Sequence, residues 1–259
     1  MSITIAIPKP DNKLSNPFNA LLEQAGFEYN PTDKENGIIT DITKDIPDIQ
    51  VIVMRTKDAI SDLCDGSITF APVGSNTLRE FQIASGKIPP ISTPITTQSA
   101  SCTFCIAGNT EDNLIENGLQ ATQGRTIVTS YPNILSDLLR KNDIVSNIKT
   151  WEGNKQNTNG IPDEKIAQIV YREGGVEKKA SSMNALVFDL VETGGTLRRN
   201  GFDTNTLLPM MQSTLVIAQS QNDRQRFIAK QDSADKFLQR LSMPRAQQQP
   251  EPLRYICAG

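Results

Sequence analysis

The residues with the clearest chemical potential lie together in one stretch, Asp189–Leu197, which reads Asp-Leu-Val-Glu-Thr-Gly-Gly-Thr-Leu. The apolar run Met183–Val191 predicts a helix that leads into a pair of carboxylates, Asp189 and Glu192. The Thr-Gly-Gly-Thr segment interrupts this helix, and Arg198–Gly201 predict a short helical restart. A loop of this composition presents backbone N–H groups, two hydroxyls and a new helix N-terminus to one point, which suits a phosphate monoester.

The individual side chains of this loop suit different parts of one ligand. Asp189 and Glu192 suit the hydroxyls of a ribose, beside a phosphate held by backbone N–H groups and hydroxyls. The residues expected to hold that phosphate are Thr193, Gly194, Gly195 and Thr196. A sugar phosphate is therefore the first ligand to expect. The segment is also compatible with a tight connection between two helices, and this alternative stays open.

Length and charge limit the class of protein. The chain has 259 residues, with 26 basic and 29 acidic side chains and 37% hydrophobic residues. This length allows one large domain or two moderate ones, with a substantial core. The near-balanced charge does not indicate a nucleic-acid-binding surface, and neither a membrane span nor a secretory signal is recognisable. We therefore expect a cytoplasmic protein that binds neither nucleic acid nor membranes.

The chain contains no histidine, which restricts its catalytic chemistry. Ser-His-Asp and Cys-His catalysis and His-ligated metal sites are excluded. Cys102 and Cys105 have the spacing of a redox or zinc half-site, but they lie in a predicted strand, where residues three apart point to opposite faces. We expect ordinary buried thiols and no metal held by the protein itself. Catalysis would then use carboxylates, lysine, arginine, hydroxyls and backbone dipoles, which suits phosphate chemistry.

The elements that position these residues alternate between strands and helices, which predicts an α/β fold with a largely parallel sheet. Strands are expected at 2–8, 50–55, 68–73, 102–107, 125–130, 167–171 and 213–218. Helices are expected at 16–26, 57–64, 113–119, 133–140, 207–211 and 222–241, and a loop at 151–164. The prolines at 89, 90 and 94 predict a crossing between domains.

Several separated segments, taken in order, resemble the catalytic subunit of ATP phosphoribosyltransferase, the first enzyme of histidine biosynthesis. The resemblance covers residues 3–220, and its most specific part is the complete match of 189–197 and 200–201. The other matching segments are Pro8-Lys9, Arg55-Thr-Lys-Asp58, Asp65-Gly66, Tyr131-Pro132-Asn133 and Gly174-Gly-Val-Glu177.

The resemblance implies an α/β fold of two lobes, like type II periplasmic binding proteins, with the active-site cleft between them. Lobe I would comprise residues 1–92 and 203–221, and lobe II residues 93–202 with the phosphate loop. A C-terminal helix at 222–245 and a flexible tail at 246–259 would follow. The resemblance is to the short family form, so we expect no regulatory domain and no feedback inhibition through one. Its expected partners are further copies of itself and a separate regulatory subunit resembling histidyl-tRNA synthetase.

The reaction implied by the resemblance joins N1 of ATP to C1 of phosphoribosyl pyrophosphate and releases pyrophosphate. Mg²⁺ would be bound mainly through the pyrophosphate. Lys9 and Arg55, at strand ends, would be catalytic groups that meet pyrophosphate or the ATP phosphates, although both are also compatible with ordinary surface charges. Glu177, Gly74 and Asn76 would contribute to substrate binding.

The chain departs from the family pattern at positions that concern the nucleotide. Thr69 and Asn76 stand where the family has two acids, and Lys13 stands where it has an arginine. A lysine keeps the charge of that arginine but loses its bidentate geometry. Three readings therefore stay open: an ATP phosphoribosyltransferase, a phosphoribosyltransferase with another acceptor, or a non-catalytic sugar-phosphate- or nucleotide-binding protein of the same fold.

Overall fold

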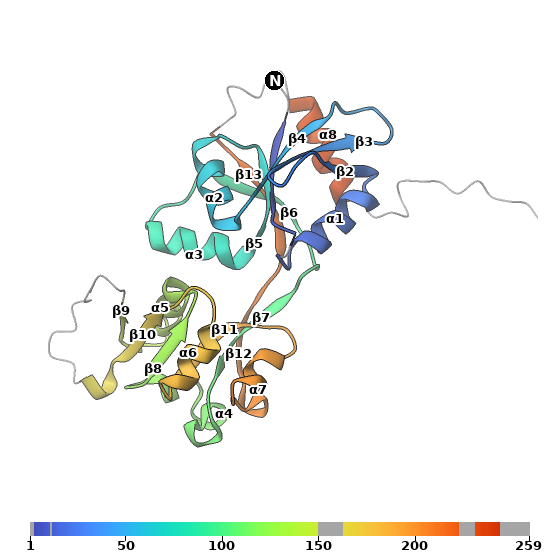
Figure 1. Cartoon of the computed structure of the whole chain (residues 1–259). Helices are drawn as coiled ribbons and strands as arrows, with labels where there is room; N and C mark the ends of the chain where they lie inside the picture. The colour runs from blue at the N-terminus through green and yellow to red at the C-terminus, as the bar shows by residue number, and fades with distance from the viewer. Residues whose placement is uncertain (1–2, 11, 150–162, 223–230, 244–259) are drawn as a thin grey trace, which may run out of the picture. The chain divides into compact units, whose positions relative to one another are not determined.

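The computed structural model describes the chain except residues 1–2, 11, 150–162, 223–230 and 244–259. The chain divides into two compact units, each assembled from separate stretches (Figure 1). Unit 1 comprises Met1–Gly74, Pro89–Ala100 and Leu215–Gly259, and unit 2 comprises Ser75–Ile88 and Ser101–Thr214. The chain therefore passes from one unit to the other four times.

Unit 1 is built on a mixed sheet whose described strands lie in the order β2-β3-β4-β1-β5-β13-β6. The strands are β1 (Thr4–Pro8), β2 (Phe27–Pro31), β3 (Asn36–Asp41), β4 (Ile49–Met54), β5 (Phe70–Gly74), β6 (Ile91–Thr96) and β13 (Leu215–Ser220). The central strands β4, β1 and β5 are parallel, so their carboxyl ends meet at one edge of the sheet. The remaining neighbours pair antiparallel.

Three described helices accompany this sheet: α1 (Ser15–Gln24), α2 (Thr56–Asp65) and α8 (Gln231–Ser242). The first two confirm the helices predicted from apolar spacing. Helix α2 ends at Gly66, whose φ of 81° is left-handed and whose N–H donates to the Asp62 carbonyl. Glycine enters this conformation without the steric cost of a Cβ, which explains why the helix stops there.

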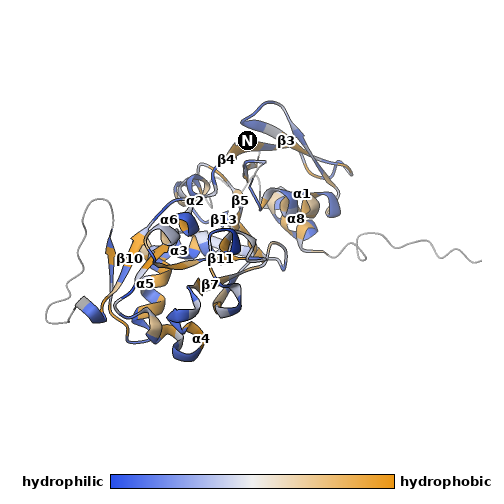
Figure 2. Cartoon of the chain, turned by 60° about the horizontal axis from the view of Figure 1, so that its bottom comes forward, coloured by the Kyte–Doolittle hydropathy of each residue, from blue (hydrophilic) through white to orange (hydrophobic). Residues whose placement is uncertain are grey.

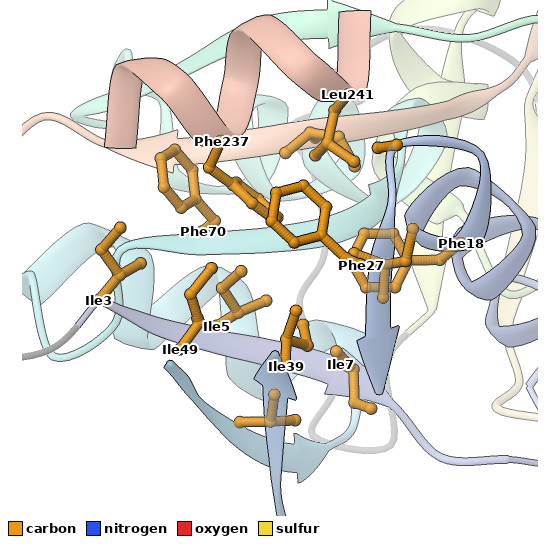
Figure 3. Packing of buried hydrophobic residues seen from close by; sticks show 14 of the residues in the cluster. Ile3, Ile5, Ile7, Phe18, Phe27, Ile39, Ile49, Phe70, Phe237 and Leu241 are labelled. Carbon is orange, nitrogen blue, oxygen red and sulfur yellow. The ribbon is translucent and has the colours of Figure 1, made fainter. Parts of the chain in front are cut away.

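The core of unit 1 forms between the sheet and helices α1 and α8 (Figure 3). The Phe237 ring of α8 lies 5.0 Å from that of Phe27 and 5.7 Å from that of Phe70, measured between ring centroids. Leu241 follows one turn later and is also buried. The amphipathic helix predicted near the C-terminus thus packs on the chain's own unit 1.

Unit 2 contains a second mixed sheet, with its described strands in the order β12-β7-β11-β8-β10-β9. The strands are β7 (Cys102–Ala107), β8 (Thr126–Thr129), β9 (Ser146–Lys149), β10 (Ala167–Tyr171), β11 (Leu186–Val191) and β12 (Leu208–Ser213). Strands β11, β8, β10 and β9 are parallel, whereas β7 and β12 run antiparallel to their neighbours. The hydropathy colouring of Figure 2 marks β10 and, in unit 1, β4 as largely hydrophobic.

The described helices of unit 2 are α3 (Ser75–Ser85), α4 (Leu114–Asn117), α5 (Pro132–Arg140), α6 (Val176–Ser182) and α7 (Gly195–Arg199). Single 3₁₀ turns lie at Thr110–Asp112, Gly118–Thr122, Asp163–Lys165 and Thr204–Thr206. One core cluster includes residues of α4, α5 and the sheet, and another includes residues of α6 and α7. None of the helices described in either unit is long and apolar enough to cross a membrane.

The helix predictions for residues 183–191 and 207–211 are wrong, because both segments are strands. Residues 183–191 hold β11, which begins after Asn184 adopts a left-handed φ of 48°. Leu186, Val187 and Phe188 are buried in the sheet, and a buried strand has the same apolar run as a buried helix. Residues 207–211 lie largely in β12, an edge strand that tolerates Pro209 at a register shift.

The boundaries of the compact units differ from those expected for the two lobes. Residues 75–88, which include α3, belong to unit 2, whereas β6 pairs with β13 in the sheet of unit 1. The return to unit 1 falls after Thr214 rather than near residue 202, because β12 still pairs with β7 of unit 2. The predicted loop at 151–164 and the tail at 246–259 lie almost entirely outside the described residues, as does the start of the C-terminal helix.

Candidate functional site

The sheet of unit 2 gathers three strand-to-helix connections at one edge. Strands β8, β10 and β11 are parallel, and each leads into a helix: α5, α6 and α7 respectively. The connections contain Tyr131, Gly174–Gly175 and Glu192–Gly194. In open α/β sheets, ligands bind outside the carboxyl ends of the strands, where such connections meet. The predicted phosphate loop therefore occupies a position at which this fold binds ligands.

The loop joins a strand to a helix, which removes the alternative of a helix–helix connection. Asp189, the fourth residue of β11, is half-buried, whereas Glu192, Thr193 and Thr196 are exposed. Gly194 precedes α7 with a left-handed φ of 71°, and no side chain caps the helix there. A Cβ on Gly194 would lie 2.9 Å from Thr204 Cγ2, so both conformation and space require glycine.

The residues that follow the loop hold it in place. The Arg198 guanidinium donates to the Thr193 carbonyl at 3.1 Å and to Thr204 Oγ1 at 3.2 Å. The Asn200 amide donates to the Thr196 carbonyl at 2.9 Å. These hydrogen bonds hold the Thr193 carbonyl of the loop and the Thr196 carbonyl of α7 in place. The first-turn N–H groups of α7 are then the natural donors to an anion.

Tyr131 lies directly before α5, at the same edge of the sheet as the loop. The Tyr131 ring packs edge-on against Phe104, with 5.0 Å between the ring centroids. Asn76 is buried at 7% exposure. Burial raises the pKa of Tyr131 well above its ordinary value, and the charge of Asp189 raises it further. The phenol therefore stays protonated at neutral pH.

Glu80 of α3 caps the start of α5, close to Tyr131. Its Oε1 accepts from the Asn133 N–H at 2.9 Å and from the Asn133 side-chain amide at 2.7 Å. Its Oε2 accepts from the Ile134 N–H at 2.8 Å. Sequence reasoning missed Glu80 because the cap comes from a residue 53 positions earlier in the chain. Tyr131 and Asn133 were singled out only as part of a segment that resembles the family.

Three predicted site residues lie together in unit 1, at the carboxyl edge of its sheet. Pro8 and Met54 are paired in the parallel register of β1 and β4, so Lys9 and Arg55 each follow directly. Gly74 ends the neighbouring strand β5 and is buried. Lys9 is exposed. Arg55 donates to both carboxylate oxygens of Asp58, at 2.8 and 3.1 Å.

The structure also bears on the predictions for Glu177 and for the two cysteines of β7. Glu177 lies half-buried in the first turn of α6, where its charge suits the helix dipole, and its substrate role stays a prediction. Cys102 and Cys105 of β7 are not in a disulfide, and burial raises the pKa of Cys105. Among the described residues, no group of three or more Cys, Asp or Glu side chains could hold a metal ion.

Comparison with known proteins supports the resemblance that the motifs indicate. The sequence model of the HisG family, described as ATP phosphoribosyltransferase, matches residues 55–243. An ATP phosphoribosyltransferase of Novosphingobium aromaticivorans is 24% identical over 219 residues, which cover 83% of this chain and 84% of the relative. Another, from Alkaliphilus metalliredigens, is 25% identical over 201 residues, which cover 77% of this chain and 79% of the relative.

Solved structures agree in fold. The chain resembles a component of the ATP phosphoribosyl transferase (HisG:HisZ) complex from Thermotoga maritima, with a TM-score of 0.61 and 17% identity over 92% of this chain and 96% of that one. A Candida albicans protein described as having the generic periplasmic binding protein fold gives a TM-score of 0.52 at 15% identity, over 93% of this chain and 69% of that one. Because the family match spans most of its length and includes the segment Asp189–Leu197, the chain belongs to the ATP phosphoribosyltransferase family.

Proposed function

We propose that this chain transfers the phosphoribosyl group of phosphoribosyl pyrophosphate to N1 of ATP, with release of pyrophosphate. The observation that supports it best is the strand–loop–helix of Asp189–Leu197, which carries the family motif inside the matched region. In this reaction the bond from ribose C1 to the pyrophosphate oxygen breaks and its electron pair leaves with pyrophosphate. N1 of the adenine then bonds to C1.

Unit 2 would hold the sugar phosphate. The N–H groups and hydroxyls of Thr193–Thr196 would bind the 5′-phosphate, because an anion at this position gains from several aligned backbone dipoles. Asp189 and Glu192 would accept hydrogen bonds from the ribose hydroxyls. Glu177, from the neighbouring connection at the same sheet edge, would assist. Such preorganised contacts lower the barrier by orienting the reacting carbon.

Unit 1 would supply positive charge for the leaving group. Lys9 and Arg55 follow adjacent parallel strands, so two cations share one sheet edge. They would stabilise the charge that develops on the departing pyrophosphate, or hold the ATP phosphates. Gly74, at the same edge, would allow close approach of the nucleotide. Mg²⁺ would arrive bound to pyrophosphate oxygens and water, which are its preferred ligands.

A different acceptor is the second candidate, and two buried side chains favour it. Thr69 Oγ1 is 3.4 Å from the Thr4 N–H, and Asn76 is hydrogen-bonded to Ser213 at 2.7 Å. Thr69 is 2% exposed and Asn76 is 7% exposed. Both neutral side chains thus have internal partners where the family pattern has acids. Because neutral side chains offer other hydrogen bonds than acids do, they would suit a base other than adenine.

We also propose partners. The Thermotoga maritima relative is part of a two-component HisG:HisZ complex. A separate regulatory subunit resembling histidyl-tRNA synthetase, and self-association of this chain, would follow from the family. Adding such a subunit should change the rate of pyrophosphate release, and light scattering of this chain alone should give more than one protomer.

The reaction itself is tested by incubating the chain with phosphoribosyl pyrophosphate, Mg²⁺ and ATP, while pyrophosphate and the absorbance of the N1 adduct are followed. Release with ATP supports the first proposal, and release only with another base supports the second. Binding without release contradicts both and leaves a sugar-phosphate-binding protein.

Two variants establish that the activity belongs to this chain. Asp189→Asn should lower the rate about 100-fold, as the loss of a group that stabilises the transition state does. Lys9→Ala should also slow release, whereas Lys34→Ala, which removes an exposed lysine of unit 1, should not. Equal rates in all four proteins would identify a contaminant.

A further inference from the structure

Arg198 contacts the loop before α7 through both its side chain and its main chain. Its guanidinium donates to the Thr193 carbonyl at 3.1 Å, and its backbone N–H donates to the Gly194 carbonyl at 3.0 Å. Both peptide units are trans, so the carbonyl and the N–H of each unit point in opposite directions. The N–H groups of Gly194 and Gly195 therefore point away from Arg198.

The backbone conformation turns these two N–H groups toward one side. Gly194 is left-handed, with φ 71° and ψ 3°, and Gly195 begins the right-handed helix α7. Successive N–H groups at such a change of hand form a concavity that suits an anion. Within the part of the chain that the structure describes, neither N–H donates a hydrogen bond to another residue. Both are thus available to a ligand.

Arg198 is itself fixed from the other side of its guanidinium. Its Nη1 donates to Thr204 Oγ1 at 3.2 Å, and Thr204 begins a 3₁₀ turn. Asp203 caps this turn by accepting from the Asn205 N–H at 2.8 Å, and it also accepts from the Thr110 hydroxyl at 3.0 Å. Arg198 therefore joins the loop to a turn that is anchored on the segment after β7.

This bridge packs directly against Gly194. A Cβ on Gly194 would lie 2.9 Å from Thr204 Cγ2 and 3.2 Å from Arg198 Nη1. The bridge matters because glycine tolerates both hands of the backbone, so its own conformation does not fix the peptide before it. Without Arg198, the peptide between Thr193 and Gly194 would be free to turn over and present its carbonyl oxygen to an anion.

We propose that Arg198 is a positioning residue: it holds the Thr193 and Gly194 carbonyls away from the ligand, so that the N–H groups of Gly194 and Gly195 donate to the phosphate of the sugar phosphate. The inference rests on the proposed function for its ligand. Position 198 lies between the two parts of the matching motif, 189–197 and 200–201, so the motif itself does not assign this role.

The first test compares the wild type with variants of the bridge in calorimetric titrations with phosphoribosyl pyrophosphate and Mg²⁺. Arg198→Met should weaken binding about tenfold, because the N–H groups are no longer held toward a charged ligand. Arg198→Lys keeps the charge but cannot bridge two acceptors with one planar group, so it should restore little of the affinity. Arg140→Met removes a 72% exposed arginine of α5 and should bind like the wild type.

Thr204→Val removes the second acceptor of the bridge without changing any charge. It should also weaken binding, and Arg198→Met combined with Thr204→Val should bind like Arg198→Met alone, within about a factor of two. Unchanged affinity in Arg198→Met would overturn the inference. Full recovery in Arg198→Lys would do so too, since Arg198 would then act by its charge alone.

The direction of the glycine N–H groups is tested by NMR of protein labelled with ¹⁵N-glycine, with the two signals assigned through Gly194→Ala and Gly195→Ala. Phosphoribosyl pyrophosphate, or inorganic phosphate if that compound does not bind, should shift both signals in the wild type and neither in Arg198→Met. If only inorganic phosphate has this effect, the proposed function fails and the inference stands. No shift in the wild type, or an equal shift in Arg198→Met, would overturn the inference.

Discussion

At the scale of single residues, Arg240 shows how one side chain fixes a whole helix. Its guanidinium donates to Asp41 at 2.6 Å and to the carbonyl of Ala25 at 2.7 Å. It also lies over the Phe27 ring, 4.4 Å from the centroid. The Asp41 side chain is 1% exposed and the Arg240 side chain 21%. Because the pair is largely buried, each charge depends on the other for its stability.

Replacing Arg240 by methionine should therefore destabilise the protein by about 2–3 kcal/mol, since a buried carboxylate loses its partner. Urea unfolding at pH 7 measures the change. Lys236→Met is the matched control, because it breaks an exposed pair with Asp232 on the same helix and should have little effect. A similar loss in both variants would contradict a specific role for Arg240.

The effect of Arg240→Met should also depend on pH. Burial alone raises the pKa of Asp41, but hydrogen bonds from Arg240 and Thr43 outweigh it, so the pKa lies below its ordinary value. A carboxyl group with a lowered pKa stabilises the fold above its unfolded pKa of about 3.9 and loses that contribution as the pH falls through its folded pKa. The difference between wild type and Arg240→Met should thus be constant above about pH 5 and shrink below about pH 4. A difference independent of pH down to acid unfolding would exclude Asp41 as the cause.

At the scale of elements, helix α5 depends on a cap supplied by α3. Tyr131, at the position before α5, makes no side-chain capping bond of its own. Glu80 takes that place and adds a negative charge at the positive end of the helix. The start of α5 is thereby joined to α3.

Glu80→Ala should lower the stability by about 1–2 kcal/mol, the usual cost of losing a helix cap. In a domain of this size the melting temperature should fall by roughly 3–6 °C. Differential scanning calorimetry measures it, with the exposed Glu116→Ala as control. An unchanged melting temperature would mean that water bonds the N–H groups of Asn133 and Ile134 as well as Glu80 does, which would contradict a stabilising cap.

A comparison of the predicted and observed elements shows how much of the fold could be predicted from the sequence alone. Strands β1, β4, β5, β7, β8 and β10 were predictable from short apolar runs between turn residues. Helix α3 was missed because its apolar positions are few, and it is secured by distant partners such as Glu80 with Asn133. Strand β11 was misread as a helix because burial on both faces removes the alternation that identifies a strand. The loop at Glu192–Gly194 could be recognised as a break between two elements because Gly194 has a left-handed φ, which is a local requirement, and its phosphate-binding role stays a prediction. The Glu80 cap of α5 depends on the tertiary fold and left no local signal.

At the scale of the whole molecule, the proposed ligand should change the stability of the protein that binds it. Phosphoribosyl pyrophosphate with Mg²⁺, at about one hundred times its dissociation constant, should add about 2.7 kcal/mol. The melting temperature should rise by roughly 5–10 °C. A variant that combines Gly194→Ala with Thr196→Ala should lose this rise, because the first change strains the loop and the second removes a hydroxyl.

Thermal unfolding with and without the ligand tests this expectation. Thr32→Ala, an exposed threonine of unit 1, is the matched control and should respond like the wild type. Equal shifts in the loop variant and the control would place the bound sugar phosphate elsewhere in the molecule. No shift in any of them would contradict sugar-phosphate binding altogether.

The interleaved path of the chain has a consequence for its biosynthesis. Strand β13 lies between β5 and β6 in unit 1, yet residues 101–214 of unit 2 are translated before it. At ordinary rates of synthesis these residues occupy the ribosome for roughly ten seconds. During that interval the facing edges of β5 and β6 have no neighbour, and bare edges readily pair with other chains. The nascent protein should therefore complete its second unit first, and it is most prone to aggregation just before the last strand of unit 1 emerges.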